Sequence, residues 1–162
     1  MVFEQRGEFP NSREIPTVNL IRPLIIDIGG ERVLLEQQVD LRSKERKPDN
    51  NSAPPWELPR ITVEVIDLGV GITMEEIRRQ LGLQVEVGDK IKEREEVLPS
   101  RTRGQTRFRT ITQVCHFKEG DVRLDSLKHQ EFEWVELDAV FDRPLDPWSE
   151  DALREYLPLG GN

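Results

Sequence analysis

The sequence has few of the residues from which disulfide, zinc or thiol sites are built. Its 162 residues include one cysteine, Cys115, and two histidines, His116 and His129. A single cysteine excludes an intramolecular disulfide and a cysteine-cluster zinc site, and it favours a reducing compartment, so we expect a cytoplasmic protein. Because Cys115 lies in the apolar run ITQVCHF, we expect it to be buried and structural rather than nucleophilic.

Long apolar runs and an excess of positive charge are also missing. No apolar run approaches the roughly 20 residues that a membrane helix needs, and residues 1–15 are too acidic and polar for a signal peptide. We therefore expect neither a membrane span nor a targeting segment. The net charge of -8 disfavours broad binding to nucleic acid, although a local basic patch remains compatible with phosphate binding.

What is present suits one folded domain with a polar surface. A chain of 162 residues, 36% of them hydrophobic, is long enough to bury a single core without disulfides or metals. We expect this domain to span residues 16–158, with a flexible N-terminal tail at 1–15 and a short tail at 159–162. Residues 42–55 combine charge, Pro, Asn and Ser without periodic apolar positions, which predicts a mobile loop.

Alternating and β-branched segments predict a sheet. Residues 17–28 and 31–39 flank Gly29-Gly30, a pattern typical of a hairpin. Further strands are expected at 83–87, 94–98, 107–117 and 131–137.

Two segments of the chain are expected to be helices. In residues 73–81, Thr73 and Glu76 have the spacing of a capping box, and Gly82 stands where a helix stops. The apolar face of this helix would hold Met74, Ile77 and Leu81. In residues 149–157, Ser149 is the expected cap. The order of elements predicts an α+β fold, an α/β/α sandwich around a mixed sheet.

The segment ITVEVIDLGVGITMEEIRRQLGL, residues 61–83, is preceded by WELP and ends at Gly82-Leu83. It resembles the Nudix box, G-x5-E-x7-R-E-U-x-E-E-x-G-U, in which U is a bulky aliphatic residue. The resemblance extends over residues 17–157, through the VLLEQQ hairpin, the HQEFEWVELDAV strand and the closing DPWSEDALREYL helix. It implies a Nudix-like mixed β-sheet with a box helix and a C-terminal helix.

The resemblance also implies a chemistry that this sequence changes. Nudix hydrolases cleave a nucleoside diphosphate linked to another moiety, with Mg²⁺ held by clustered carboxylates of the box helix. In the shared register, Ile61 takes the place of the first glycine and Asp67 that of the first glutamate. The adjoining Glu-Glu pair is replaced by Arg79 and Gln80. We therefore expect a degenerate Nudix box without the ordinary metal shell.

Some acidic residues of the box remain as candidates. Glu75 stands in the place of the box arginine, and Glu76 alone among the acidic positions is unchanged. If the protein is active, Glu76 is the catalytic residue, and Mg²⁺ would be held by Glu64, Asp67, Glu75 and Glu76.

The segment RTRGQTRFR concentrates arginines in an otherwise acidic chain. In a hairpin turning near Gly104, same-parity arginines can share a face and bind phosphate in bidentate fashion. The candidate substrate-binding residues are Arg79, Arg101, Arg103, Arg107 and Arg109. The alternative is a solvated arginine edge that pairs with the many carboxylates of the chain.

Three functional hypotheses follow. In the first, the chain is a pseudoenzyme that recognises a nucleotide or nucleoside-diphosphate-type ligand, or a protein partner, including a second copy of itself. In the second, it is an active Nudix hydrolase with a displaced Mg²⁺ shell. In the third, it is a structural or regulatory interaction subunit.

Overall fold

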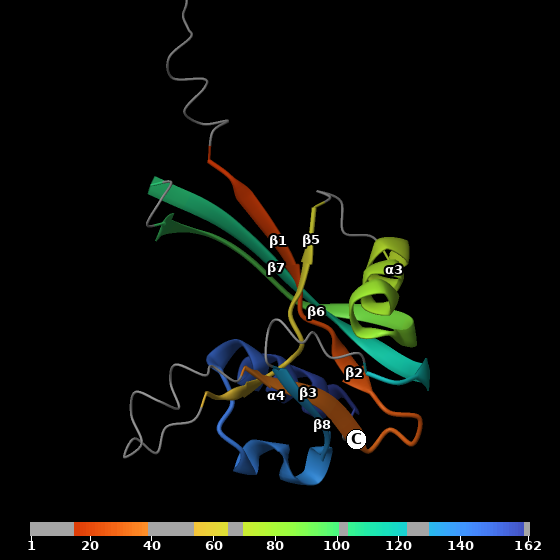
Figure 1. Cartoon of the computed structure of the whole chain (residues 1–162). Helices are drawn as coiled ribbons and strands as arrows, with labels where there is room; N and C mark the ends of the chain where they lie inside the picture. Colours follow the sequence, from red (N-terminus) through yellow and green to blue (C-terminus); the bar gives the residue numbers. More distant parts are fainter. Residues whose placement is uncertain (1–14, 39–53, 65–69, 101–103, 123–129, 161–162) are drawn as a thin grey trace, which may run out of the picture.

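The fold is seen in a computed structural model that describes residues 15–38, 54–64, 70–100, 104–122 and 130–160 (Figure 1). The N-terminal tail and most of the loop expected at 42–55 lie outside these residues. The strands are β1 (Thr17–Ile21), β2 (Leu24–Ile26), β3 (Arg32–Gln38), β4 (Trp56–Glu57), β5 (Ile61–Val63), β6 (Leu83–Ser100), β7 (Gly104–Gly120) and β8 (Gln130–Glu136). The helices are α3 (Val70–Leu81), the 3-10 helix η1 (Leu137–Asp142) and α4 (Pro147–Gly160).

The strands form the predicted mixed sheet, with the long strand β7 at its centre. On one side β7 pairs antiparallel with β6, and on the other it pairs in parallel with β1 and then β2. Strands β1 and β2 are separated at Arg22-Pro23, because a proline has no amide hydrogen to donate to the sheet. On its other edge β1 pairs with β5. Strand β2 pairs with β3, which in turn pairs with β4 and β8.

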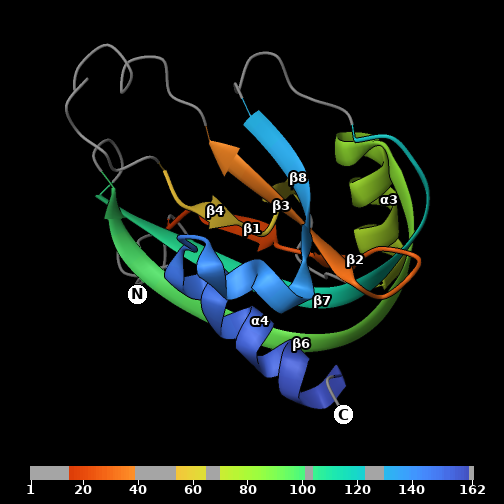
Figure 2. The ribbon, with the colours of Figure 1, turned by 90° about the horizontal axis from the view of Figure 1, so that it is seen from below.

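Both faces of the sheet are apolar, because the buried strands alternate their side chains between two cores. Ile25 and Leu34 face α3 and pack with Ile77 and Leu81 of that helix. Their sequence neighbours face α4, where Leu24, Ile26, Val33 and Leu35 pack with Leu58, Val135, Val140, Ala152 and Leu153. Figure 2 shows α3 and α4 on opposite sides of the strands. The α/β/α sandwich predicted from the sequence is confirmed.

Helix α3 begins earlier than the sequence indicated. It starts at Val70, so Thr73 lies inside the helix and is no cap. The Thr73 hydroxyl is fully buried and donates to Oε1 of Gln113 on β7, 2.7 Å away. Met74 is 43% exposed and leaves the apolar face to Ile77 and Leu81. Gly82 ends the helix as predicted, with a φ of 81° that favours glycine.

Helix α4 also starts at a different residue. It begins at Pro147, and the Asp146 side chain caps it by accepting a hydrogen bond from the Ser149 amide at 3.2 Å. Ser149, the expected cap, is instead buried and accepts a hydrogen bond from the Leu58 amide at 2.8 Å. The helix continues to Gly160, two residues past the expected domain boundary.

Strand β6 runs without interruption through residues 88–93, where the sequence suggested a gap. Register shifts between Val87 and Lys92 accommodate this charged stretch within the pairing to β7. No helix among the described residues is long and apolar enough to cross a membrane.

Candidate functional site

Helix α3 carries the box residues and is fixed to the sheet by its buried face. Because Ile77 is fully buried, Glu76, Arg79 and Gln80 point outward or along the edge of the helix. The side chain of Glu76 is 21% exposed and that of Arg79 is 62% exposed. The helix therefore presents these two side chains at the surface, beside β5.

The retained glutamate is held by the two residues that replace the metal-binding pair. Nη2 of Arg79 lies 2.5 Å from Oε1 of Glu76, and Nε2 of Gln80 donates to the same oxygen at 2.8 Å. Gln80 Nε2 also donates to the carbonyl of Thr62 on β5 at 2.9 Å. The Glu76 carboxylate is thus bound within its own helix and tied to the neighbouring strand.

These contacts keep Glu76 ionised. Partial burial raises the pKa of Glu76, but the hydrogen bonds from Arg79 and Gln80 outweigh it, and the net pKa lies below the ordinary value. The pKa of Arg79 is raised by its hydrogen bond and charge interaction with Glu76, and further by the charges of Glu64 and Glu75. Arg79 therefore stands as a fixed cation among carboxylates.

Among the described residues, the other predicted metal ligands form no cluster with Glu76. Glu75 pairs with Arg78 at 2.8 Å, and Glu64 lies exposed just after β5. Asp67 lies outside the described residues. Within the part of the chain that the structure describes, no group of three or more acidic, histidine or cysteine side chains is placed to hold a metal.

An open hollow lies beside the outer face of α3. Its volume is about 620 Å³, and it is lined by Glu75, Arg78, Arg79, Gly82, Gln84, Glu119 and Gly120. Two of the lining residues, Gly82 and Gly120, are closely packed. Position 120 requires glycine, because a Cβ there would lie 2.5 Å from the carbonyl oxygen of Gly82. Arg79 borders both this hollow and the Glu76 carboxylate.

The arginines expected to bind phosphate are only partly described. β6 and β7 form the expected hairpin, in which Ser100 pairs with Gly104. Across it, Arg107 lies 3.1 Å from Glu95 and Arg109 lies 3.5 Å from Glu93. Arg101 and Arg103 lie outside the described residues. For Arg107 and Arg109 the geometry favours the alternative of pairing with carboxylates.

Cys115 is fully buried on β7, and burial raises the pKa of its thiol to about 12. At neutral pH the side chain is therefore a neutral thiol, which is a poor nucleophile. The expectation that Cys115 is buried is confirmed.

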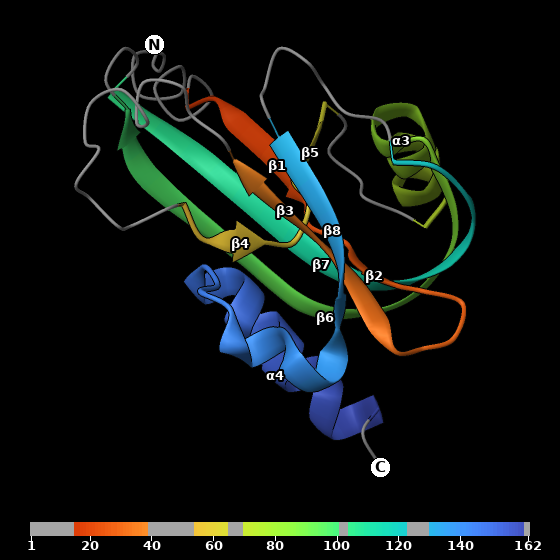
Figure 3. The ribbon, with the colours of Figure 1, turned by 60° about the horizontal axis from the view of Figure 1, so that its bottom comes forward.

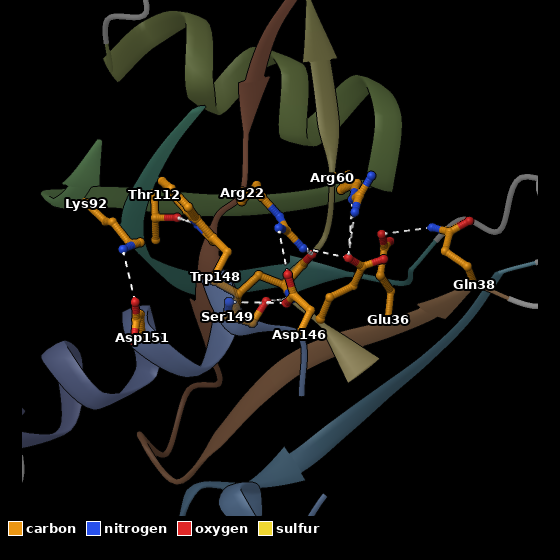
Figure 4. A network of polar contacts seen from close by, with 12 residues as sticks. Arg22, Glu36, Gln38, Arg60, Lys92, Thr112, Asp146, Trp148, Ser149 and Asp151 are labelled. Atoms are coloured by element: carbon orange, nitrogen blue, oxygen red, sulfur yellow. Dashed lines mark hydrogen bonds and ion pairs between the residues drawn. The ribbon is translucent and has the colours of Figure 1, made fainter. Parts of the chain in front are cut away.

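A buried charge cluster, which the sequence analysis missed, lies where β1 and β2 separate (Figure 4). Arg22, 5% exposed, binds Glu57 of β4 at 2.7 Å and Asp146 at 3.2 Å. Arg60 lies 3.2 Å from the same Glu57 oxygen. The cluster joins the strand break, the WELP segment before the box and the start of α4. Two places in the sequence could have indicated this cluster, because a charged residue stands directly before a proline at the end or start of an apolar segment. They are Arg22-Pro23 and Asp146-Pro147.

Glu36 lies against this cluster and carries a perturbed pKa. It is opposite Glu57 in the register of β3 and β4 and has no exposed surface. Burial, reinforced by the negative charge of Glu57, raises the pKa of Glu36 to about 7, although Arg22 and Arg60 oppose the change. Gln38 donates to its Oε2 at 3.2 Å.

Together, the two-faced mixed sheet, the box helix over one face and the closing helix over the other define a Nudix-like fold, as the sequence predicted. Among the solved structures with this fold, the MutT protein from Methanosarcina mazei Go1 has a TM-score of 0.63 at 20% identity, over 92% of this chain and 99% of that one. An Ap4A hydrolase from C. elegans, solved as a binary complex, has a TM-score of 0.59 at 15% identity, over 90% of this chain and 99% of that one.

The MutT protein from Bacillus halodurans is similar at a TM-score of 0.62 and 16% identity, over 86% of this chain and 82% of that one. At these identities the likeness establishes the fold alone. No protein-family model matches the sequence, and neither does any curated protein.

Proposed function

We propose that this chain is a Nudix-fold domain without ordinary metal-dependent hydrolysis, which recognises a nucleotide-type, phosphate-bearing ligand or a protein partner. The observation that carries the proposal is the contact of Arg79 and Gln80 with one oxygen of Glu76. A metal bound at the box would have to share the Glu76 carboxylate with these two donors, one of which is a cation.

The described box residues do not fit Mg²⁺. This ion demands an octahedral shell of oxygen ligands and is usually bound by one or two carboxylates together with waters and phosphate oxygens. Here the guanidinium of Arg79 lies beside the only retained box glutamate. Two like unit charges about 4 Å apart at an effective dielectric near 20 repel by roughly 4 kcal/mol, so Arg79 opposes a divalent cation at this position.

The same guanidinium supports recognition of a phosphate-bearing ligand. Arginine presents planar donors that match phosphate oxygens, and Arg78 and Arg79 both line the hollow beside α3. The volume of this hollow lies within the range of roughly 300–1,000 Å³ typical of ligand sites. The residues that line it are charged rather than apolar, which suits a polar ligand. The similar C. elegans protein is an Ap4A hydrolase, and this supports the nucleotide class. Arg101 and Arg103 stay candidates for the same role.

A second candidate function is an active hydrolase with a displaced metal shell. It is favoured by the exposure of Arg79 and by the charges of Glu64 and Glu75 near it. If the guanidinium turned to solvent or onto a substrate phosphate, Glu76 would be released toward a metal, and Asp67 would be the remaining ligand to place. This reading requires that Glu76→Gln abolish turnover.

The deciding experiment is a hydrolysis panel with Mg²⁺ or Mn²⁺ on ADP-ribose, NADH and dinucleoside polyphosphates. We expect the wild-type protein to show no more turnover than Glu76→Gln. Hydrolysis at ordinary enzymatic rates that is lost in Glu76→Gln would contradict the proposal and establish the second function.

Calorimetric titration with Mn²⁺ tests whether Arg79 and Gln80 are the reason that the box does not bind a metal. We expect negligible binding by the wild type and measurable binding by the double variant Arg79→Glu with Gln80→Glu, which restores the acidic pair. Arg78→Glu is the control, because it makes the same arginine-to-glutamate exchange one position before Arg79, at a residue paired with Glu75 rather than Glu76.

Ligand recognition is separated from assembly by thermal unfolding in the presence of nucleotides without metal. A ligand that binds only the native state raises the apparent melting temperature. A shift with ADP-ribose that Arg79→Gln reduces would support the ligand function. Absence of any shift across nucleotides and inorganic phosphate would leave the third hypothesis, an interaction subunit, as the function to pursue. A cytoplasmic location also remains a prediction.

A further inference from the structure

The buried charge cluster around Arg22 is balanced only while one of its carboxyl groups carries a proton. Its cations are Arg22 and Arg60, and its carboxyl groups belong to Glu36, Glu57 and Asp146. Arg22 donates to Glu57 at 2.7 Å and to Asp146 at 3.2 Å, while Arg60 lies 3.2 Å from Glu57. Two cations therefore face two carboxylates when Glu36 is protonated, and three when it is ionised.

Glu36 and Glu57 are opposite each other in the register of β3 and β4, but the two strands are not equally fixed. Strand β3 pairs with β8 over its whole length, from Arg32 to Gln38. Strand β4 has only two residues and lies at the end of the sheet order, beside β3 (Figure 3). Moving Glu57 out of the cluster therefore disrupts little of the sheet, whereas moving Glu36 disrupts much of it. When both glutamates are ionised, β4 is the element that can move.

Residues 56–60, which we call the latch segment, are also attached to the start of α4. The amide of Trp56 donates to the carbonyl of Pro144 at 2.9 Å. The amide of Leu58 donates to the Ser149 hydroxyl at 2.8 Å. Both hydrogen bonds would break if the latch segment left its place, so these two amides report whether it is attached.

Release of the latch segment would also relieve the charge imbalance. The side chain of Arg60 is 53% exposed and pairs with Glu57, so these two opposite charges can move into water together. Arg22 would then remain between Glu36 and Asp146, and it would still face two carboxylates. Release therefore leaves no buried cation without a counter-charge, which would otherwise be costly.

We propose that the cluster is a proton-sensitive latch, which holds residues 56–60 against β3 and α4 while Glu36 is protonated and releases them when it ionises, the rest of the sheet staying folded. Because the pKa of Glu36 is raised to about 7, the attached state is favoured below this pH and is lost as the pH rises through it. The latch segment continues directly into β5, where the Thr62 carbonyl binds Gln80 of the box helix. The latch does not depend on the proposed ligand function, and the two can fail separately.

Native-state hydrogen exchange at the Trp56 and Leu58 amides tests the proposal. After correction for the intrinsic pH dependence of exchange, we expect the opening equilibrium of both amides to rise about tenfold from about pH 6 to about pH 8. The rise should be absent in Glu36→Gln, which cannot ionise, and present in Glu131→Gln, which removes an exposed charge on β8. No rise in the wild type would overturn the proposal, and so would an equal rise in Glu36→Gln.

Low concentrations of urea separate release of the latch segment from unfolding of the whole protein. Local opening exposes little surface, so at about pH 8 exchange at Trp56 and Leu58 should respond weakly to urea. Amides of the β3–β8 ladder should respond strongly, because they exchange when the sheet unfolds. An equal response of both groups would mean that residues 56–60 open only with the whole protein, which is incompatible with a latch.

Glu57→Gln keeps the test decisive should Glu36→Gln fold poorly. The amide retains an oxygen for Arg22 but carries no charge, so an ionised Glu36 then gives two carboxylates for two cations. We expect the Trp56 and Leu58 amides of this variant to stay protected at about pH 6 and to show no rise in opening up to about pH 8. A rise as large as that of the wild type would contradict the role of the facing glutamates.

Discussion

Glu36 is an acidic side chain with no contact with solvent in a protein whose other charges are mostly at the surface. Around it, the positive charges of Arg22 and Arg60 are matched by the negative charges of Glu57 and Asp146. A neutral Glu36 therefore leaves the cluster balanced, and an ionised one adds an unmatched buried charge. This explains why the pKa of Glu36 is raised to about 7.

The stability of the fold is expected to depend on this proton. Because the native pKa lies above the ordinary value, the stabilisation is complete below about pH 4.5 and is lost as the pH rises through about 7. A shift of this size corresponds to at most about 3 kcal/mol. In Glu36→Gln this dependence should vanish, because the amide keeps an oxygen for Gln38 and cannot ionise. Urea denaturation of both proteins from about pH 5 to about pH 8 measures the difference.

The control for this prediction is Glu131→Gln, an exposed position on the neighbouring strand β8. Its pH dependence should follow that of the wild type. If wild type and Glu36→Gln lost stability in parallel over this range, the buried glutamate would not be the group that titrates.

At the scale of elements, the start of α4 is fixed by Asp146 rather than by the helix residues themselves. One carboxylate oxygen of Asp146 caps the helix at the Ser149 amide, while the other binds Arg22 at 3.2 Å. Pro147 follows at the first helical position, where its missing amide hydrogen costs nothing. The Asp146 side chain therefore stabilises both the N-terminus of α4 and the buried Arg22.

Asp146→Ala should therefore destabilise the protein by more than a cap alone. Loss of a helix cap costs about 1 kcal/mol, and loss of a partner of the buried Arg22 adds to it, so we expect about 2–4 kcal/mol. Asp146→Asn retains a capping oxygen and should cost less than Asp146→Ala. Chemical denaturation compares them, with Asp151→Ala, an exposed residue 3.6 Å from Lys92, as a control near zero. Equal losses for Asn and Ala would show that the cap contributes nothing.

At the scale of the whole molecule, two cores share one sheet. Adjacent residues of β3, Leu34 and Leu35, belong to different cores, so neither core can open without disturbing the strand that supports the other. The buried charge cluster adds a second link between β4 and α4. This arrangement predicts one cooperative unfolding transition.

Coincidence of two signals tests this prediction. Trp134 packs against the α3 core and Trp148 lies at the start of α4, so tryptophan fluorescence reports on both sides of the sheet. Its transition in urea should overlay that of far-ultraviolet circular dichroism. Leu34→Ala and Leu35→Ala should each lower stability by about 2–5 kcal/mol without separating the two curves. Curves that separate would mean that the cores unfold independently.

Much of the fold could be predicted because it follows from local pattern. Alternation in the strands, the hairpin at Gly29-Gly30 and the stop at Gly82 depend on neighbours in sequence, and each is found in the structure. Predictions of helix starts were less accurate. Thr73 and Ser149 both have side chains suited to capping, but each is used for a long-range hydrogen bond, to Gln113 and to Leu58 respectively.

The sequence by itself determined the layered fold, the position of the box helix and the presence of Arg79 and Gln80 beside Glu76, since residues three and four apart on a helix are neighbours. Only the tertiary structure decided what these residues contact beyond the helix, such as the Thr62 carbonyl that Gln80 binds. It alone also decided the burial of Glu36. The physical reason is that burial and charge balance depend on segments far apart in the chain, such as Arg22, Glu57 and Asp146, whose meeting no local pattern encodes.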